Sequence, residues 1–321
     1  MPIQWHPILI RLLKREMGDT ITIIEELPLG EAPVRVDMVM VCTAPVEQLP
    51  SPYCYLKQRT LVEFKGPDDR AVGEDLARLE AYGILYQIQE GIYQRENICL
   101  WLAASQFSAR YLHSYGTRVE GLRQVEPGIQ IGRMDGFWLC ILDLQSLSVN
   151  RYTLPWLMVT RGRKEREVIE YIVEHHEELH EYIEDIARLH WNALTEVLRM
   201  KDIDLEAIGF DFRKFVEDVG IDRLVKSIGI DRLIASVGID KLVESVGVDK
   251  LIESVGIDKL IESVGIDRLA QSIEISKLID AVGTEHVLQI VETEKLLDEL
   301  VRRCGKEQLR RMLDGDVERD E

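Results

Sequence analysis

A nine-residue repeat governs what the C-terminal part of this chain can fold into. Six close copies of the pattern VGIDKLIES run from Val219 to Ser272, and two diverged copies begin at Ile273 and Val282. One continuous helix is a poor explanation, because nine residues advance about two and a half turns and place equivalent apolar residues on opposite faces. A glycine in every copy would also cost a helix about 1 kcal/mol each time. The repeat therefore predicts short, separate helices.

Each copy contains a start signal and a stop signal for its helix. The aspartates are expected to cap the helix N-termini, and the glycine seven residues later to end each helix in the left-handed conformation. These aspartates are Asp222, Asp231, Asp240, Asp249, Asp258 and Asp267. Helices of about six residues are unstable alone, so the copies must stack on one another. We expect a solenoid of short helices over 202–303 and a charged cap and tail over 304–321.

The segment before the repeats has the pattern of one long amphipathic helix over 161–201. Apolar residues such as Val168, Ile172, Tyr182 and Ile186 recur at alternating four- and three-residue steps, which is the spacing of a coiled-coil seam. This pattern predicts a helix that connects two parts of the chain or pairs with a second copy. A homo-oligomer formed through this helix, through the repeats, or through both is the expected assembly. A protein partner of the repeats is a further expectation.

Charge is distributed unevenly along the chain. Residues 1–164 contain 18 Lys and Arg against 19 Asp and Glu, whereas the rest of the chain has 21 against 38 and supplies most of the net charge of −18. The first part can approach a polyanion, and the second should repel one. The five cysteines include no C-x-x-C pair, and no segment has the length and apolar character of a membrane span or leader. We expect a cytoplasmic protein without a membrane partner.

The remaining sequence, residues 1–160, reads as an α/β domain. Its helices are predicted at 7–17, 74–89 and near 108–115, and its strands at 20–24, 34–41, 60–65, 98–103 and 137–144, with a glycine-rich hairpin around 127–136.

Two acidic residues interrupt apolar strands of this domain, where a carboxylate is costly unless it is paired or binds a cation. They are Asp37 and Glu63, and Lys65 projects from the same face as Glu63 because strand side chains alternate. Two carboxylates, waters and a phosphate oxygen can complete an octahedral site for Mg²⁺ or Mn²⁺. Lys65 can serve as catalytic base or offset charge that develops on a phosphate. The trio predicts a site for metal-dependent phosphodiester hydrolysis.

Together, Asp37, the Glu63-Phe64-Lys65 strand and the helix after it resemble the PD-(D/E)xK nuclease superfamily, although Val36 replaces the proline of the motif. The added repeats resemble its recombination-promoting nuclease and putative transposase branch. The resemblance implies a restriction-endonuclease-like mixed sheet flanked by helices, and an endonuclease that cuts double-stranded DNA in mobile-element movement or in defence against foreign DNA. It also implies a third acidic metal ligand on the first helix, for which Glu16 is the candidate. Arg59, Arg70 and Arg78 flank the site and are candidate contacts to DNA phosphates.

Three other interpretations remain open. Asp37 and Glu63 can be salt-bridge partners of Arg35 or Lys65 on an edge strand. The protein can be a non-catalytic scaffold that uses the nuclease-like fold and the repeats for binding. Finally, the segment from His176 to His180 satisfies H-E-x-x-H, which on a helix would form a zinc peptidase site with Glu177 as base.

Overall fold

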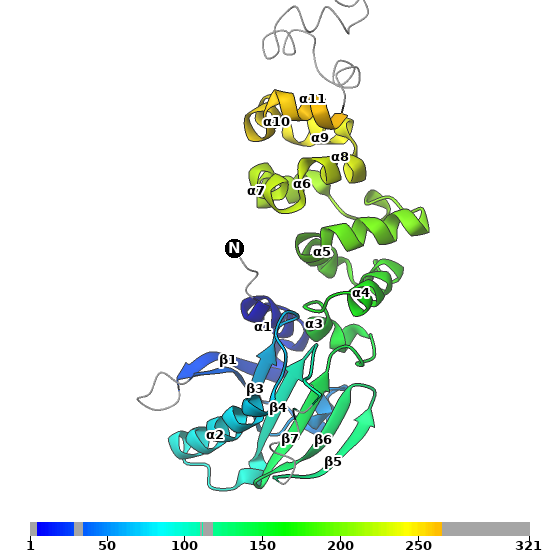
Figure 1. Cartoon of the computed structure of the whole chain (residues 1–321). Coiled ribbons are helices and arrows are strands. Elements are labelled where there is room, and N and C mark those ends of the chain that lie inside the picture. Colours follow the sequence, from blue (N-terminus) through cyan, green and yellow to red (C-terminus); the bar gives the residue numbers. More distant parts are fainter. Residues whose placement is uncertain (1–4, 29–34, 110, 112–117, 265–321) are drawn as a thin grey trace, which may run out of the picture. The chain divides into compact units, whose positions relative to one another are not determined.

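The computed structural model describes residues 5–28, 35–109, 111 and 118–264 (Figure 1). It confirms the mixed α/β class and divides the chain into two compact units, Met1–Ile186 and Ala187–Glu321. The predicted copies from Asp267 onward and the tail at 304–321 lie outside the described residues, as does most of the helix expected near 108–115. No helix in the described ranges has both the length and the apolar character needed to cross a membrane.

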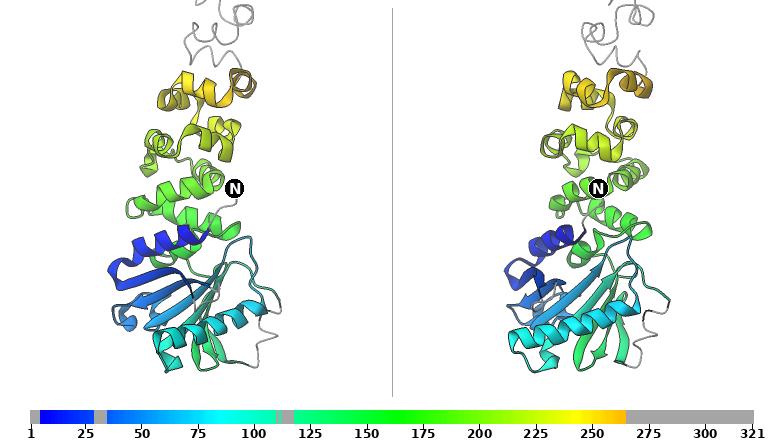
Figure 2. Two further views of the ribbon diagram at one scale, coloured as in Figure 1. Left: turned by 90° about the vertical axis from the view of Figure 1, so that its left-hand side faces the viewer. Right: turned by 60° about the vertical axis from the view of Figure 1, so that its left-hand side comes forward.

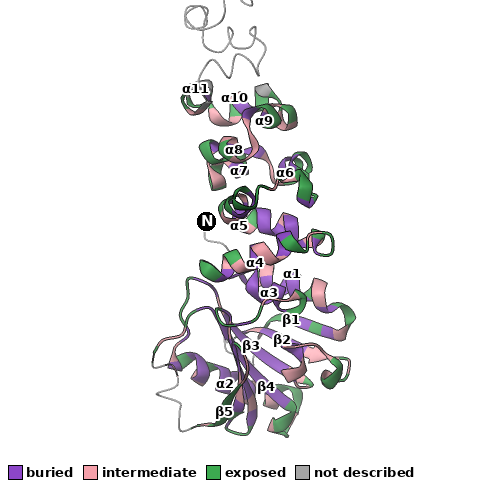
Figure 3. Ribbon diagram, turned by 90° about the vertical axis from the view of Figure 1, so that its right-hand side faces the viewer, coloured by how far each residue is buried: buried purple, intermediate pink, exposed green. Residues whose placement is uncertain are grey.

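Within the described residues, seven strands of the first unit form one mixed sheet in the order β1-β2-β3-β4-β7-β6-β5. Their bounds are β1 Ile21–Pro28, β2 Arg35–Cys42, β3 Arg59–Lys65, β4 Ile98–Ala104, β5 Val119–Glu126, β6 Ile129–Met134 and β7 Phe137–Asp143. The neighbours β3, β4 and β7 run parallel, and the other pairs are antiparallel. The apolar runs of the sequence form the central strands because these are buried on both faces (Figure 3).

Helices cover both faces of this sheet. Helix α2 (Gly73–Glu90) lies across one face, where its apolar stripe packs on Leu61, Leu100 and Ile141 (Figure 2). On the other face, Trp156 of α3 (Leu154–Leu157) packs against Trp101 of β4. Helix α1 (Trp5–Met17) contacts α3 and β1. Short 3-10 turns lie at Gly18–Thr20, Val46–Gln48, Tyr53–Tyr55, Arg95–Asn97, Arg151–Thr153 and Glu206–Ile208.

The prediction of one long helix over 161–201 is wrong. The range contains α4 (Arg163–Glu174) and α5 (His180–Lys201), which are separated by a turn, and α5 is itself kinked at His190. The apolar stripe is used inside the first unit, where Val168, Ile172, Tyr182 and Ile186 are all buried. These apolar residues are therefore not available to form a coiled coil with a second copy, because they already pack within the chain.

The predicted boundary at residue 160 also differs from the structure, in which the first unit extends to Ile186. Ion pairs attach the start of α5 to α1. Asp185 accepts from Arg11 at 2.6 Å and from Arg15 at 2.7 Å, and the Tyr182 hydroxyl donates to Glu16 at 2.8 Å. Sequence spacing cannot show such contacts, because the partners are separated by more than 160 residues.

The repeats form helices of eight residues joined by single glycines. These are α7 Ile221–Ile228, α8 Ile230–Val237, α9 Ile239–Val246, α10 Val248–Val255 and α11 Ile257–Val264, preceded by α6 Phe212–Val219. The expected capping is wrong in detail. Asp222 and its equivalents are the second residue of each helix. Each glycine is the C-cap of one helix and the N-cap of the next.

Each linking glycine has a φ of 81° to 91° with an extended ψ of 135° to 151°. This is not the left-handed helical conformation that we expected. It is a backbone conformation that is strained for any residue other than glycine. Helices in the row contact the next helix and also the third one along, since α6 meets α9, α7 meets α10 and α8 meets α11. Leu224, Leu233 and Leu242 are buried by this packing.

The glycine conformation leads to a test of the repeats. Replacing Gly229 with Ala adds no clash, because nothing lies within 4 Å of the new Cβ, but it forces a side chain into φ +91°. We expect Gly229→Ala to lower the unfolding free energy by about 1–3 kcal/mol, measured by urea denaturation. Lys226→Ala, an exposed change in the preceding helix, should stay within about 0.5 kcal/mol of wild type. Equal midpoints for Gly229→Ala and wild type would contradict the assigned conformation.

Candidate active site

The register of the sheet brings the two predicted strand carboxylates together. Met38 of β2 pairs with Val62 of β3, so continuing this antiparallel register by one residue places Asp37 opposite Glu63. Side chains that oppose each other across two strands have Cβ atoms about 5 Å apart. The charge of Asp37 also acts on Glu63 and contributes to raising its pKa. Both residues lie on interior strands, so the edge-strand part of the alternative interpretation is wrong, whereas the ion pair that it expected between Glu63 and Lys65 is present.

Lys65 lies where predicted, on the same face as Glu63, and connects two buried carboxylates. Its Nζ is 2.8 Å from Glu63 Oε1 and 3.0 Å from Asp75 Oδ1. Arg78 reaches the same two atoms at 3.4 Å and 3.1 Å. Glu63 and Asp75 are only 4% and 3% exposed. Such deeply placed carboxylates require partners, and the two cations supply them.

Asp75 is a member of this cluster that sequence reasoning missed. It lies in the first turn of α2, where its Oδ2 accepts from the backbone N–H of Val72 at 2.8 Å. A carboxylate in the first turn of a helix is ordinarily a capping residue, and that role hides its second contact with Lys65. The available signal was the α2 stripe itself, because Asp75, Leu79 and Tyr82 recur at helical spacing and share a face.

His6 also contacts this cluster. Its Nε2 lies 3.2 Å from Asp37 Oδ2 and 3.3 Å from Phe64 O. The backbone N–H of Phe64 donates to the same Asp37 oxygen at 2.8 Å. Trp5 packs closely beside the end of β3, since a Cβ on Gly66 would meet its ring at 2.9 Å. The N-terminus of α1 thus fixes one oxygen of Asp37.

Burial and neighbouring charges set the protonation of this cluster. Burial is the main cause of the raised pKa of Glu63, followed by the charge of Asp37, and these outweigh the opposing effect of Lys65. Burial alone would lower the pKa of Lys65, but its contacts with Glu63 and Asp75 outweigh that effect and raise it. The hydrogen bond to Asp37 raises the pKa of His6. Lys65 therefore stays protonated and is unsuited to act as a base.

The arrangement suits a divalent cation that keeps part of its water shell. Asp37 Oδ1 and Glu63 Oε2 have no hydrogen-bond or ion-pair partner among the residues that the structure describes. In the same residues, no group of three or more His, Cys, Asp or Glu forms a metal cage. Mg²⁺ is commonly held by one or two carboxylates with waters and substrate phosphate oxygens completing the octahedron. Asp37 and Glu63 fit that mode.

The predicted third ligand, Glu16, is not at this site. It lies at the C-terminal end of α1, about 15 Å along the helix from His6. Its carboxylate is already paired, with Arg151 at 3.1 Å and the Tyr182 hydroxyl at 2.8 Å. Glu16 therefore connects helices of the first unit rather than binding metal with Asp37.

The three arginines predicted as phosphate contacts have different places in the structure. Arg78 belongs to the buried-carboxylate cluster. Arg59 begins β3, about 20 Å along the strand from Lys65, so it is too far away to act at the same phosphate. Arg70 is exposed in the loop between β3 and α2, and it stays a predicted phosphate contact.

The H-E-x-x-H segment lacks the geometry of a zinc peptidase. His176 and Glu177 lie in the turn between α4 and α5, and only His180 is in a helix. Two histidines four residues apart share a face only when both belong to one helix. His176 Nδ1 instead lies 3.0 Å from the Val173 carbonyl oxygen, which its position at the end of α4 explains.

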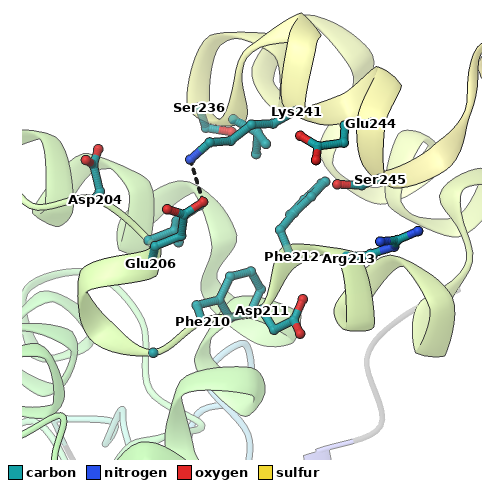
Figure 4. A pocket seen from close by; sticks show the side chains of 13 residues that line it. Asp204, Glu206, Phe210, Asp211, Phe212, Arg213, Ser236, Lys241, Glu244 and Ser245 are labelled. Atoms are coloured by element: carbon teal, nitrogen blue, oxygen red, sulfur yellow. Dashed lines mark hydrogen bonds and ion pairs between the residues drawn. The ribbon is translucent and has the colours of Figure 1, made fainter.

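The second unit contains a pocket of about 440 Å³ between the segment at 204–213 and helices α8 and α9. Lys241 Nζ contacts Glu206 Oε1 at 2.8 Å across it (Figure 4). The charged lining consists of Asp204, Glu206, Asp211 and Glu244 against Arg213 and Lys241. These carboxylates come from helices and loops and do not form a pair on facing strands as Asp37 and Glu63 do. The cluster around Asp37 and Glu63 is therefore the better candidate for phosphodiester chemistry.

Comparison with protein-family models, curated proteins and solved structures gives no match for this chain.

The contact between His6 and Asp37 predicts a specific titration. Asp37 favours the charged form of His6 and so raises its pKa. The contact therefore stabilises the folded state fully below the ordinary histidine pKa of 6.5, and this stabilisation is lost as the pH rises through the raised pKa. We expect Asp37→Asn to lower the pKa of His6, measured by NMR titration and assigned with His6→Gln. An unchanged pKa of His6 in Asp37→Asn would show that the contact is absent in solution.

Proposed function

We propose that the first unit is a metal-dependent nuclease that hydrolyses DNA phosphodiester bonds. The observation that supports this best is the placement of Asp37 opposite Glu63 on interior strands, each with one oxygen free to bind a cation. Lys65, held in the charged form beside them, supplies a fixed cation at the same strand end. Carboxyl ends of parallel strands are common places for ligands in α/β sheets.

Each residue of the cluster has a distinct task in this proposal. A Mg²⁺ or Mn²⁺ ion bound between Asp37 and Glu63 would lower the pKa of a water molecule and polarise a phosphate oxygen. Lys65 offsets negative charge that develops on the phosphate, because its contacts keep it protonated. Asp75 and Arg78 fix the position of Lys65 and Glu63. His6 fixes one oxygen of Asp37, which would leave the other available to the cation.

The finer fold assignment forms part of the same proposal. A mixed sheet in which an Asp-bearing strand lies beside a Glu-x-Lys strand, followed by a helix across the same face, supports a restriction-endonuclease-like domain. Such a domain would suit double-stranded DNA and a role in mobile-element movement or in defence against foreign DNA. The contacts of each repeat helix with the third one along support a solenoid in the second unit.

A scaffold protein is the second candidate function. The observation in its favour is the repeat unit, in which equivalent helices offer regularly spaced exposed charges and the pocket near Lys241. In this function the repeats would bind a protein partner or assemble copies of the chain. The two functions are compatible, because the candidate site and the repeats belong to separate units.

The nuclease proposal is tested by cleavage of plasmid DNA with Mg²⁺ or Mn²⁺. Removing one group that stabilises developing charge typically costs about 10²–10³ in rate. We expect Lys65→Ala and Asp37→Asn to lose at least that much activity, and chelation of the metal to abolish it. Arg59→Ala is the matched control, because it removes a cation from the other end of the same strand and should retain nearly full activity.

If wild type and Lys65→Ala are equally inert with several divalent metals, the nuclease proposal fails and the scaffold function remains. Equal cleavage by both proteins would also contradict the assigned site.

A further inference from the structure

A second cavity lies on the same face of the sheet as the candidate active site. It has a volume of about 260 Å³ and is lined by residues that include Phe107, Tyr111, Gln130, Ile141 and Asp143. This volume lies slightly below the range of pockets that hold drug-sized ligands. It therefore suits a single planar ring better than a folded peptide.

The sheet register fixes where this cavity lies relative to Lys65. Lys65 pairs with Ala104 of β4, and Ala104 pairs with Asp143 of β7, so the three residues form one row across parallel strands. Glu63, Leu102, Ile141 and Gln130 form the next row. Residues paired in this way share a face of the sheet, and neighbouring strands are about 4.8 Å apart. The Asp143 backbone is thus about 10 Å from that of Lys65.

The lining combines aromatic rings with hydrogen-bond acceptors. Phe107 and Tyr111 have ring centroids 4.8 Å apart, and the charge of Asp143 contributes, after burial, to raising the pKa of Tyr111. Gln130 Oε1 is buried and has no hydrogen-bond partner among the described residues. A buried acceptor without a donor is costly, which indicates that a donor is supplied from outside the described residues.

We propose that this cavity binds an unpaired nucleobase of the strand whose phosphate lies at Lys65. The proposal rests on the proposed nuclease function and adds a base subsite to it. The aromatic side chains would contact the base, as in proteins that bind single strands. Gln130 Oε1 is an acceptor without a donor among the described residues, so it favours a base whose exocyclic amino group offers two N–H donors, such as cytosine or adenine, over thymine, which offers only N3–H.

The test compares binding of three single strands of equal length, oligo-dC, oligo-dT and an abasic strand, by fluorescence anisotropy with chelator present so that nothing is cleaved. Wild type should bind oligo-dC about tenfold more tightly than oligo-dT, and the abasic strand most weakly. Gln130→Leu keeps the side-chain volume and should remove the preference for dC. Phe107→Leu should weaken binding of both base-bearing strands about tenfold and leave the abasic strand unchanged.

Tyr93→Leu is the control, because Tyr93 is 87% exposed and outside the cavity, and it should bind as wild type does. Circular dichroism verifies that each variant is folded, and Gln130→Leu keeps the test decisive if Phe107→Leu unfolds. Equal wild-type affinity for all three strands, or wild-type selectivity in Gln130→Leu, overturns the proposal. A base preference without plasmid cleavage would support the subsite and reject the nuclease, whereas cleavage without base preference would reject the subsite alone.

Discussion

The pairing of two buried carboxylates with two cations is the interaction on which the candidate site depends. Glu63 and Asp75 are almost fully enclosed, and an unpaired charge at such depth would be neutralised or would destabilise the fold. Lys65 and Arg78 remove that penalty by sharing both carboxylates. The same contacts fix the site before any ligand arrives. A charge held in place by its neighbours needs little rearrangement during a reaction.

Much of the first unit follows from local sequence patterns. The strands β2, β3, β4 and β7 lie within one residue of their predicted bounds, because uninterrupted apolar runs favour buried strands. Strand β1 extends four residues beyond its prediction, and β5 was not predicted. Asp37 and Glu63 were identifiable for the same reason, since each interrupts such a run. Asp75 was not, because its role depends on contacts across the fold. Glu16 was misassigned because its true partners, Arg151 and Tyr182, are remote in sequence.

The repeats show a different limit of sequence reasoning. Short helices ended by glycine were predicted correctly, but the helix starts were placed at Asp222 and its equivalents because aspartate is a preferred N-cap. The structure places the helix starts one residue earlier, because consecutive helices are joined by a single glycine with φ above 80° that ends one helix and begins the next. The aspartate is then the second residue of the helix, where its charge still complements the positive end of the helix dipole. Aspartate is favourable both as the N-cap and as the second residue of a helix, so the sequence preference alone does not distinguish the two helix starts. The packing of the helices selects one of them.

Charge balance at the cluster gives an electrostatic reason for the metal dependence that we propose. Asp37, Glu63 and Asp75 face two permanent cations, Lys65 and Arg78, and both cations are already engaged by carboxylates. A phosphodiester that approaches this cluster therefore meets no excess of positive charge. A divalent ion held by Asp37 and Glu63 would offset the charge of these carboxylates and leave Lys65 in place beside the substrate. In the proposed nuclease, the ion would contact the scissile phosphate as well as activate water, whereas binding of a base in the proposed subsite does not require it.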